Sequence, residues 1–98
     1  MLHLVNKSPS DSTAFESASK YAQKGSGILL FEDGVYAAMA GTAYEGKIKE
    51  IMGDHDVYAL KEDLTARGIA DRVIDGVKEI TYPDFVDLVE QNKIASWS

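Results

Sequence analysis

The chain has 98 residues, a formal net charge of −6, 45% hydrophobic and 27% charged residues, and no cysteine. This length suits a single domain, residues 1–98, and leaves no room for a second. No run of Lys or Arg exceeds one residue, so the chain lacks the basic surface that direct nucleic-acid binding requires. The missing thiol excludes disulfides, thiolate metal sites and persulfide chemistry carried by this chain itself.

The sequence also lacks the usual signals for a membrane or secreted protein. No apolar stretch approaches the roughly 20 residues that span a bilayer, and the first residues, 1–6, are too short an apolar run for a signal peptide. We therefore expect a cytoplasmic protein without membrane contact.

The first half of the chain begins with a strand, a helix and a second strand. Residues 2–5 form a short apolar run that predicts a buried strand. Thr13 and Glu16 have the spacing of a capping box, and apolar residues at helical intervals predict a helix over roughly 13–23. Residues 27–31 are continuously apolar, which is typical of a central strand in a parallel sheet.

The middle of the chain repeats this alternation. Residues 35–40 predict a short helical turn. Thr42 and Glu45 again have capping-box spacing, and Gly53 can end the helix that follows them. Residues 57–60 then predict a third strand.

The last third continues in the same way. Residues 62–68 carry acids early, a base late and a final glycine, which predicts a short helix. Residues 77–81 predict a fourth strand, and Pro83 and Asp84 open another helix. Residues 94–97 can add a last strand.

Strands that alternate with helices over the whole length predict an α/β fold. Right-handed βαβ units build a mostly parallel sheet between two helical layers. We expect four or five strands in a three-layer domain.

One edge of such a sheet collects the loops that follow the strands' carboxyl ends. These loops are residues 6–10, 32–34 and 61–63. Lys7, the hydroxyls of Ser8 and Ser10 and the helix N-terminus that follows could bind an anion at this edge, next to Asp33. The alternative, which we favour, makes Lys7 a surface partner of the nearby acids.

The other polar residues point to no catalytic group. The loop carboxylates (Glu32, Asp33, Glu62 and Asp63) are better explained as caps and turn residues than as metal ligands, so we expect no metal and no cofactor. His3 and His55 have no visible nucleophile to serve. We expect His3 to be hydrogen-bonded in or beside the core and His55 to be an exposed turn residue.

Aromatic residues are the candidates for a subunit interface. Tyr36 and Tyr44 flank a short turn, and Trp97 lies in the last predicted strand. Large aromatic side chains often anchor interfaces. The alternative for each ring, which we favour, is packing within the chain.

Several blocks of the sequence resemble the DsrH/TusB family. Residues 2–9, Leu-His-Leu-Val-Asn-Lys-Ser-Pro, are similar to the start of its members. The similarity continues, in the family's order and spacing, through residues 29–38, 57–68 and 80–88 and as far as Trp97. The resemblance therefore covers nearly the whole chain.

The resemblance implies a DsrE/F/H-like (flavodoxin-like) fold and a place in a heterohexamer with two copies of each of three related subunits. The companions would be DsrE/TusD-like and DsrF/TusC-like subunits, which relay sulfur as persulfide toward a DsrC/TusE-like acceptor. The pathway would be formation of 2-thiouridine at the tRNA wobble position. The alternative is a DsrEFH-type complex in dissimilatory sulfur oxidation.

One departure from some relatives shapes the functional prediction. Some members from sulfur oxidisers carry a cysteine in a segment resembling residues 15–18, where this chain has Ala18. A methyl group cannot hold a persulfide, so we predict a non-catalytic subunit that forms a homo-oligomer when it is produced alone. A different class of function, a small anion-binding module using Lys7 and Ser8, stays open.

Overall fold

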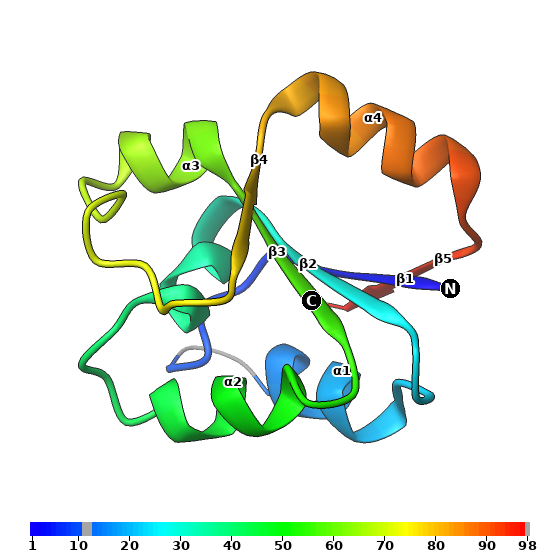
Figure 1. The fold of residues 1–98 in the computed structure, drawn as a ribbon, viewed down its shortest axis with the longest axis horizontal. Helices are drawn as coiled ribbons and strands as arrows, with labels where there is room; N and C mark the ends of the chain where they lie inside the picture. The colour runs from blue at the N-terminus through cyan, green and yellow to red at the C-terminus, as the bar shows by residue number, and fades with distance from the viewer. Residues whose placement is uncertain (11–12, 98) are drawn as a thin grey trace.

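A parallel sheet of five strands organises the chain (Figure 1). The computed structural model describes residues 1–10 and 13–97. All strand pairs are parallel, in the order β4-β3-β2-β1-β5. The strands are β1 Leu2–Val5, β2 Gly27–Leu30, β3 Asp56–Leu60, β4 Lys78–Ile80 and β5 Ile94–Trp97. The predicted parallel sheet is confirmed, and it includes the optional last strand.

The helices flank this sheet on both sides. Figure 1 shows α1 and α2 on one side of the strands and α3 and α4 on the other, which confirms the three layers. The helices are α1 Ala14–Tyr21, the 3-10 helix η1 Glu32–Ala38, α2 Glu45–Ile51, α3 Lys61–Ala66 and α4 Tyr82–Gln91. The predicted turn at 35–40 is therefore a 3-10 helix that begins three residues earlier.

The helix starts differ in how well they match the capping predictions. At α4, the Thr81 side chain and the Asp84 carboxylate form the reciprocal contacts of a capping box. At α1, the Thr13 side chain forms no capping hydrogen bond, so the first predicted box is wrong. At α2 the pattern is shifted, because Glu45 accepts the N–H of Gly41 and thereby closes the preceding turn.

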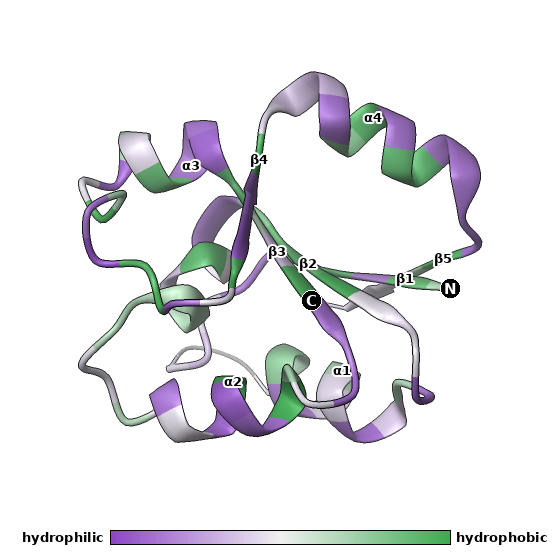
Figure 2. Ribbon diagram, in the orientation of Figure 1, coloured by the Kyte–Doolittle hydropathy of each residue, from purple (hydrophilic) through white to green (hydrophobic). Residues whose placement is uncertain are grey.

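The main core lies between the sheet and the layer of α1 and α2. Parallel pairing brings side chains of neighbouring strands onto the same face, so one face of β1, β2 and β3 is apolar apart from the buried His3. The strand members of this core are Val5, Ile28, Leu30, Val57 and Ala59, and the helices add Phe15, Ala18, Ile48 and Ile51. Figure 2 shows hydrophobic colour along the central strands.

The opposite face of the sheet is covered more thinly. Leu2 and Leu29 are buried there, yet α4 has no buried residue. The ring of Phe85 meets Phe31 edge-on at 5.7 Å. Tyr82 and Val86 on the same helix are exposed. The α4 layer therefore rests on the sheet through partly covered side chains.

Across the part of the chain that the structure describes, none of the helices is long and apolar enough to span a membrane.

Candidate functional site

Three loops meet at the carboxyl edge of the sheet, as the strand pattern predicts, and Arg67 connects two of them. Its guanidinium lies 2.9 Å from Asp33, at the start of η1 after β2, and 3.5 Å from Asp63 in α3. Asp63 also accepts the backbone N–H of Glu32 at 2.7 Å. Arg67 is only 22% exposed, so these contacts are partly shielded from water. Asp33 and Asp63 at this edge are thus paired with Arg67.

The segment after β2, at the start of η1, has an unusual conformation. Glu32 has a φ of 49°, the left-handed region that few non-glycine residues adopt. Two residues later, the backbone of Gly34 passes so close to the end of β1 that an added Cβ would lie 2.1 Å from the carbonyl oxygen of Val5. The hydrogen bond from Glu32 to Asp63 and the close contact at Gly34 together hold this loop in one position.

The predicted anion site is only partly assembled. Ser8 is buried, and its hydroxyl lies 2.9 Å from the hydroxyl of Ser10. Asp33 is bound to Arg67. Among residues 1–10 and 13–97, Lys7 is exposed and forms no salt bridge. The expectation that Lys7 pairs with the acids is therefore wrong, because Arg67 takes that place. Binding of an anion by Lys7 and Ser8 stays a prediction.

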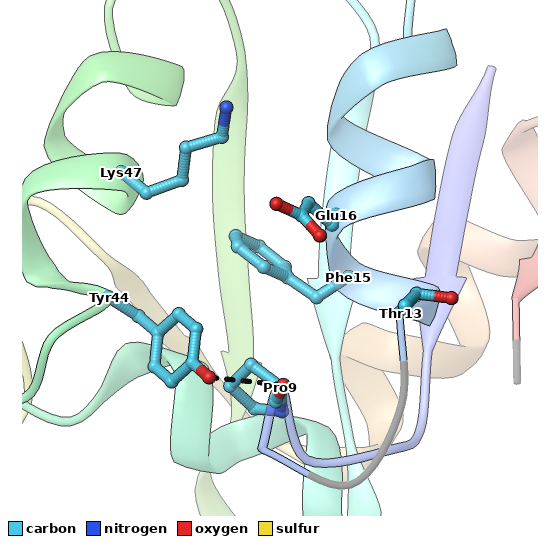
Figure 3. Close-up of a pocket in the computed structure, with 6 residues that line it drawn as sticks. All are labelled: Pro9, Thr13, Phe15, Glu16, Tyr44 and Lys47. Carbon is cyan, nitrogen blue, oxygen red and sulfur yellow. Dashed lines mark hydrogen bonds between the residues drawn. The ribbon is translucent and has the colours of Figure 1, made fainter.

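A pocket of about 280 Å³ lies between α1, α2 and the loop after β1 (Figure 3). Its floor and one wall are aromatic, formed by Phe15 and Tyr44. Glu16 and Lys47 face each other across it from α1 and α2. The remaining lining residues are Pro9 and Thr13. Since the pocket places one carboxylate opposite one ammonium group, it can hold a polar group of a ligand or partner over an apolar floor.

The pocket continues into a more open hollow along α1. This hollow measures about 450 Å³, shares Glu16 and Lys47, and adds Ser17 and Lys20. Sequence reasoning did not find Lys47 or Arg67, because neither belongs to a recognisable motif. Each becomes part of a site only when distant segments of the chain come together.

The predicted interface residues have contacts within the chain. Tyr36 is half-buried against the main core. Tyr44 donates its hydroxyl to the carbonyl of Pro9 at 3.2 Å and ties α2 to the loop after β1. Trp97 is half-buried beside His3. A role for these rings in contact with another subunit stays a prediction.

Ala18, where some relatives have a cysteine by resemblance, lies on the core side of α1. Its side chain is fully buried, with 0% exposure. The exposed face of this helix is formed by its neighbours instead, and Glu16 and Ser17 line the pocket and hollow. A thiol at the Ala18 position would therefore be enclosed by the core.

The two histidines form hydrogen bonds within the chain. His3 is 3% exposed, and its Nδ1 accepts the indole N–H of Trp97 at 3.0 Å. This confirms the expectation of a hydrogen-bonded core histidine. His55 lies in the turn before β3, but it is half-buried, and its Nδ1 lies 2.9 Å from the carbonyl of Ser26. The expectation of an exposed residue is wrong here, because the turn folds back onto the start of β2.

The burial of His3 predicts a pH dependence of stability. Burial lowers the pKa of His3 below its ordinary value, and the nearby Met1 ammonium and His55 lower it further. In the unfolded chain His3 titrates near its ordinary pKa of about 6.5. Between the two pKa values the unfolded chain binds more protons, so the free energy of unfolding falls as the pH drops below about 6.5.

Urea unfolding of the wild type at pH 7.5 and pH 5.5 measures this loss. His3→Asn is the matched variant, because its side-chain oxygen can still accept from Trp97 but cannot titrate. We expect a smaller difference between the two pH values in this variant. An equal difference in both proteins would contradict the assignment.

The polar side chains at these sites are suited to binding and to holding the loops in place. Within residues 1–10 and 13–97 no group of His, Asp and Glu side chains could hold a metal ion. Glu62, like Asp63, serves as a cap, because it accepts the backbone N–H of Tyr82 at 3.0 Å and anchors the start of α4. Glu62 and Asp63 therefore act as caps, as the sequence interpretation favoured, whereas Asp33 and Asp63 are ion-pair partners of Arg67.

The fold and these contacts define a small parallel α/β protein whose loops are joined by one arginine and which has no thiol. Solved structures share this fold. The ychN protein from E. coli matches with a TM-score of 0.76 and 18% identity over 97% of each chain. Protein Tm0979 from Thermotoga maritima matches with a TM-score of 0.64 and 27% identity over 94% of each chain.

Sequence comparison identifies the family. The profile described as DsrH like protein matches residues 7–94. Protein TusB from Photorhabdus laumondii is 40% identical over 98 residues, which cover 99% of this chain and all of that protein. Protein TusB from Escherichia coli O81 is 37% identical with the same coverage. The chain belongs to the DsrH family.

Proposed function

We propose that this chain is a non-catalytic subunit of a cytoplasmic sulfur-relay complex that supports 2-thiouridine formation at the tRNA wobble position. The observation that carries the proposal is 40% identity to a TusB protein over the full length of both chains. The relay needs a thiol to hold persulfide sulfur, and this chain has no cysteine. The transfer step therefore belongs to companion subunits.

The companions are DsrE/TusD-like and DsrF/TusC-like chains in a heterohexamer, with a DsrC/TusE-like protein as the sulfur acceptor. This chain contributes a surface that its companion subunits recognise and bind. The loops joined by Arg67 and the pocket between α1 and α2 are the features that support this role, because both present polar side chains at the surface. The TusB relatives favour the tRNA pathway over sulfur oxidation.

Co-purification from the native cells tests the assembly. We expect the tagged chain to bring down the two homologous subunits in equal amounts, as measured by quantitative mass spectrometry. The tag expressed alone is the control. Recovery of neither homologue would contradict the proposal.

A second measurement separates the two pathways. Deletion of the gene should lower the 2-thiouridine content of tRNA, as measured by nucleoside mass spectrometry, and the wild-type gene should restore it. The purified chain incubated with a persulfide donor and labelled sulfur should remain unlabelled. An unchanged 2-thiouridine content together with impaired sulfur oxidation would favour the DsrEFH-type alternative.

A further inference from the structure

The last strand, β5, forms an open edge of the sheet. In the described residues β5 pairs only with β1, in a parallel register that aligns Leu2 with Ile94. The N–H of Leu2 donates to the carbonyl of Lys93 at 2.8 Å. Because backbone groups alternate along a strand, Ala95 directs its N–H and C=O toward β1. Ile94 and Ser96 direct theirs away from the sheet, and both residues are exposed.

The opposite edge of the sheet is protected by charge. There β4 has only three residues, Lys78, Glu79 and Ile80. Lys78 forms a salt bridge with Asp56 on β3 at 3.0 Å. Charged side chains and short length are the usual means by which an edge strand avoids pairing with another chain. None of the residues of β5 is charged, so of the two sheet edges in residues 1–10 and 13–97 the β5 edge is the one that lacks this protection.

Exposed aromatic surface lies directly beside the open edge. The ring of Tyr21 on α1 is stacked on Trp97 of β5, with centroids 5.9 Å apart and an interplanar angle of 7°. Trp97 is in turn held by its hydrogen bond to His3. Tyr21 is nevertheless 66% exposed. Since the stacking already restricts these rings, a partner that covers them loses little side-chain entropy.

We propose that a second copy of this chain docks on this surface by antiparallel pairing of β5 with β5, which joins the two sheets across a twofold axis. An unpaired strand edge takes another extended strand, because only that supplies donors and acceptors at the matching spacing. With Ala95 on the axis, Ile94 of each copy lies opposite Ser96 of the other. Each of these pairs exchanges two backbone hydrogen bonds.

The side chains fit this self-pairing. Ile94 and Ser96 lie on the same face of the sheet, so the register brings matching faces together. The residue on the axis, Ala95, is small, and no acid of this chain of net charge −6 lies on the strand. Like-charge repulsion at the contact is therefore absent. Closed twofold dimers are also the commonest form of self-association.

Analytical ultracentrifugation over a concentration series tests the docking surface. The wild type should be a dimer. Ser96→Pro removes an N–H that faces away from β1, and Tyr21→Ala removes the exposed ring. Each should raise the dimer dissociation constant about tenfold or more, which corresponds to about 1.4 kcal/mol. Tyr82→Ala is the matched control, because Tyr82 is 57% exposed on α4 away from β5, and it should dimerise like the wild type.

A cross-linking experiment reports the register directly. Ala95→Cys introduces the chain's only thiol, so any disulfide must join two copies. Residues that face each other at a non-hydrogen-bonded antiparallel position have Cα atoms about 4.5 Å apart, which a disulfide can bridge. We expect rapid covalent dimer formation, whereas Thr65→Cys, exposed on α3, should remain largely monomeric.

These experiments test the proposed dimer independently of the proposed role in sulfur relay. A wild type that is monomeric at every concentration overturns it. So does a dimer that persists with unchanged affinity in both Ser96→Pro and Tyr21→Ala. Circular dichroism and thermal melting of the variants show whether loss of the dimer is caused by the altered surface or by unfolding of the protein. The Ala95→Cys cross-link is measured on protein whose circular dichroism spectrum matches that of the wild type.

Discussion

Gly34→Ala should destabilise the protein by at least about 3 kcal/mol, a large share of the roughly 5–15 kcal/mol that holds a typical domain together. The added Cβ would lie 2.1 Å from the carbonyl oxygen of Val5 and 2.9 Å from its carbonyl carbon. Val5 is fully buried. The same Val5 carbonyl accepts the N–H of Phe31 at 3.1 Å. The methyl group can therefore fit only if β1 and the start of η1 separate.

Gly46→Ala is the matched control for this substitution. Gly46 lies in α2, and an added Cβ there meets no atom within 4 Å. Alanine favours helix over glycine by up to about 1 kcal/mol, so this variant should be as stable as the wild type or slightly more stable. Urea unfolding followed by circular dichroism compares the two. Wild-type stability of Gly34→Ala would show that the close approach of η1 to β1 is wrong.

Ala18→Cys should give a thiol that is almost unreactive in the native protein. The side chain of Ala18 is fully buried in the main core. A reagent reaches it only after local or global opening, so labelling should be slowed about 100-fold or more relative to the unfolded chain. One extra core atom costs about 1 kcal/mol of stability, which leaves the fold intact.

Lys20→Cys supplies the comparison, because Lys20 is exposed on the same helix and lines the hollow beside α1. Each variant contains a single thiol, since the chain has no cysteine of its own. Labelling with a chromogenic disulfide reagent, in buffer and in urea, gives the protection of each site. Equal native rates at the two positions would mean that α1 does not pack as described.

This result bears on the sulfur-relay role. If residue 18 is protected, restoring a thiol there would not by itself create a sulfur acceptor, because a donor persulfide could not reach it. The absence of sulfur transfer would then depend on the packing of α1 as well as on the missing cysteine. The contribution of this chain would lie in its exposed surfaces, the pocket lined by Glu16 and Lys47 among them.

The pattern of strands and helices could be predicted because it depends on local periodicity and on stop signals. The continuous apolar run at β2 and the proline at the start of α4 are examples. The local pattern predicts the 3-10 helix three residues too late, because its first residue, Glu32, adopts a left-handed backbone that no local signal indicates. A contact with Asp63, distant in the sequence, stabilises that conformation.

The local pattern of the amino-acid sequence determined that this is an α/β chain, and the absence of cysteine determined that it cannot hold persulfide sulfur. The DsrH family followed from the resemblance of whole sequence blocks to its members. The helical spacing of Phe15, Ala18 and Ala22 already indicated that Ala18 faces the core, but only the tertiary structure decided that Arg67 joins the loops and that β5 is left open beside Tyr21. These features depend on contacts between segments that are distant in the sequence. Strand order and helix packing determine those contacts, and no local sequence pattern encodes them.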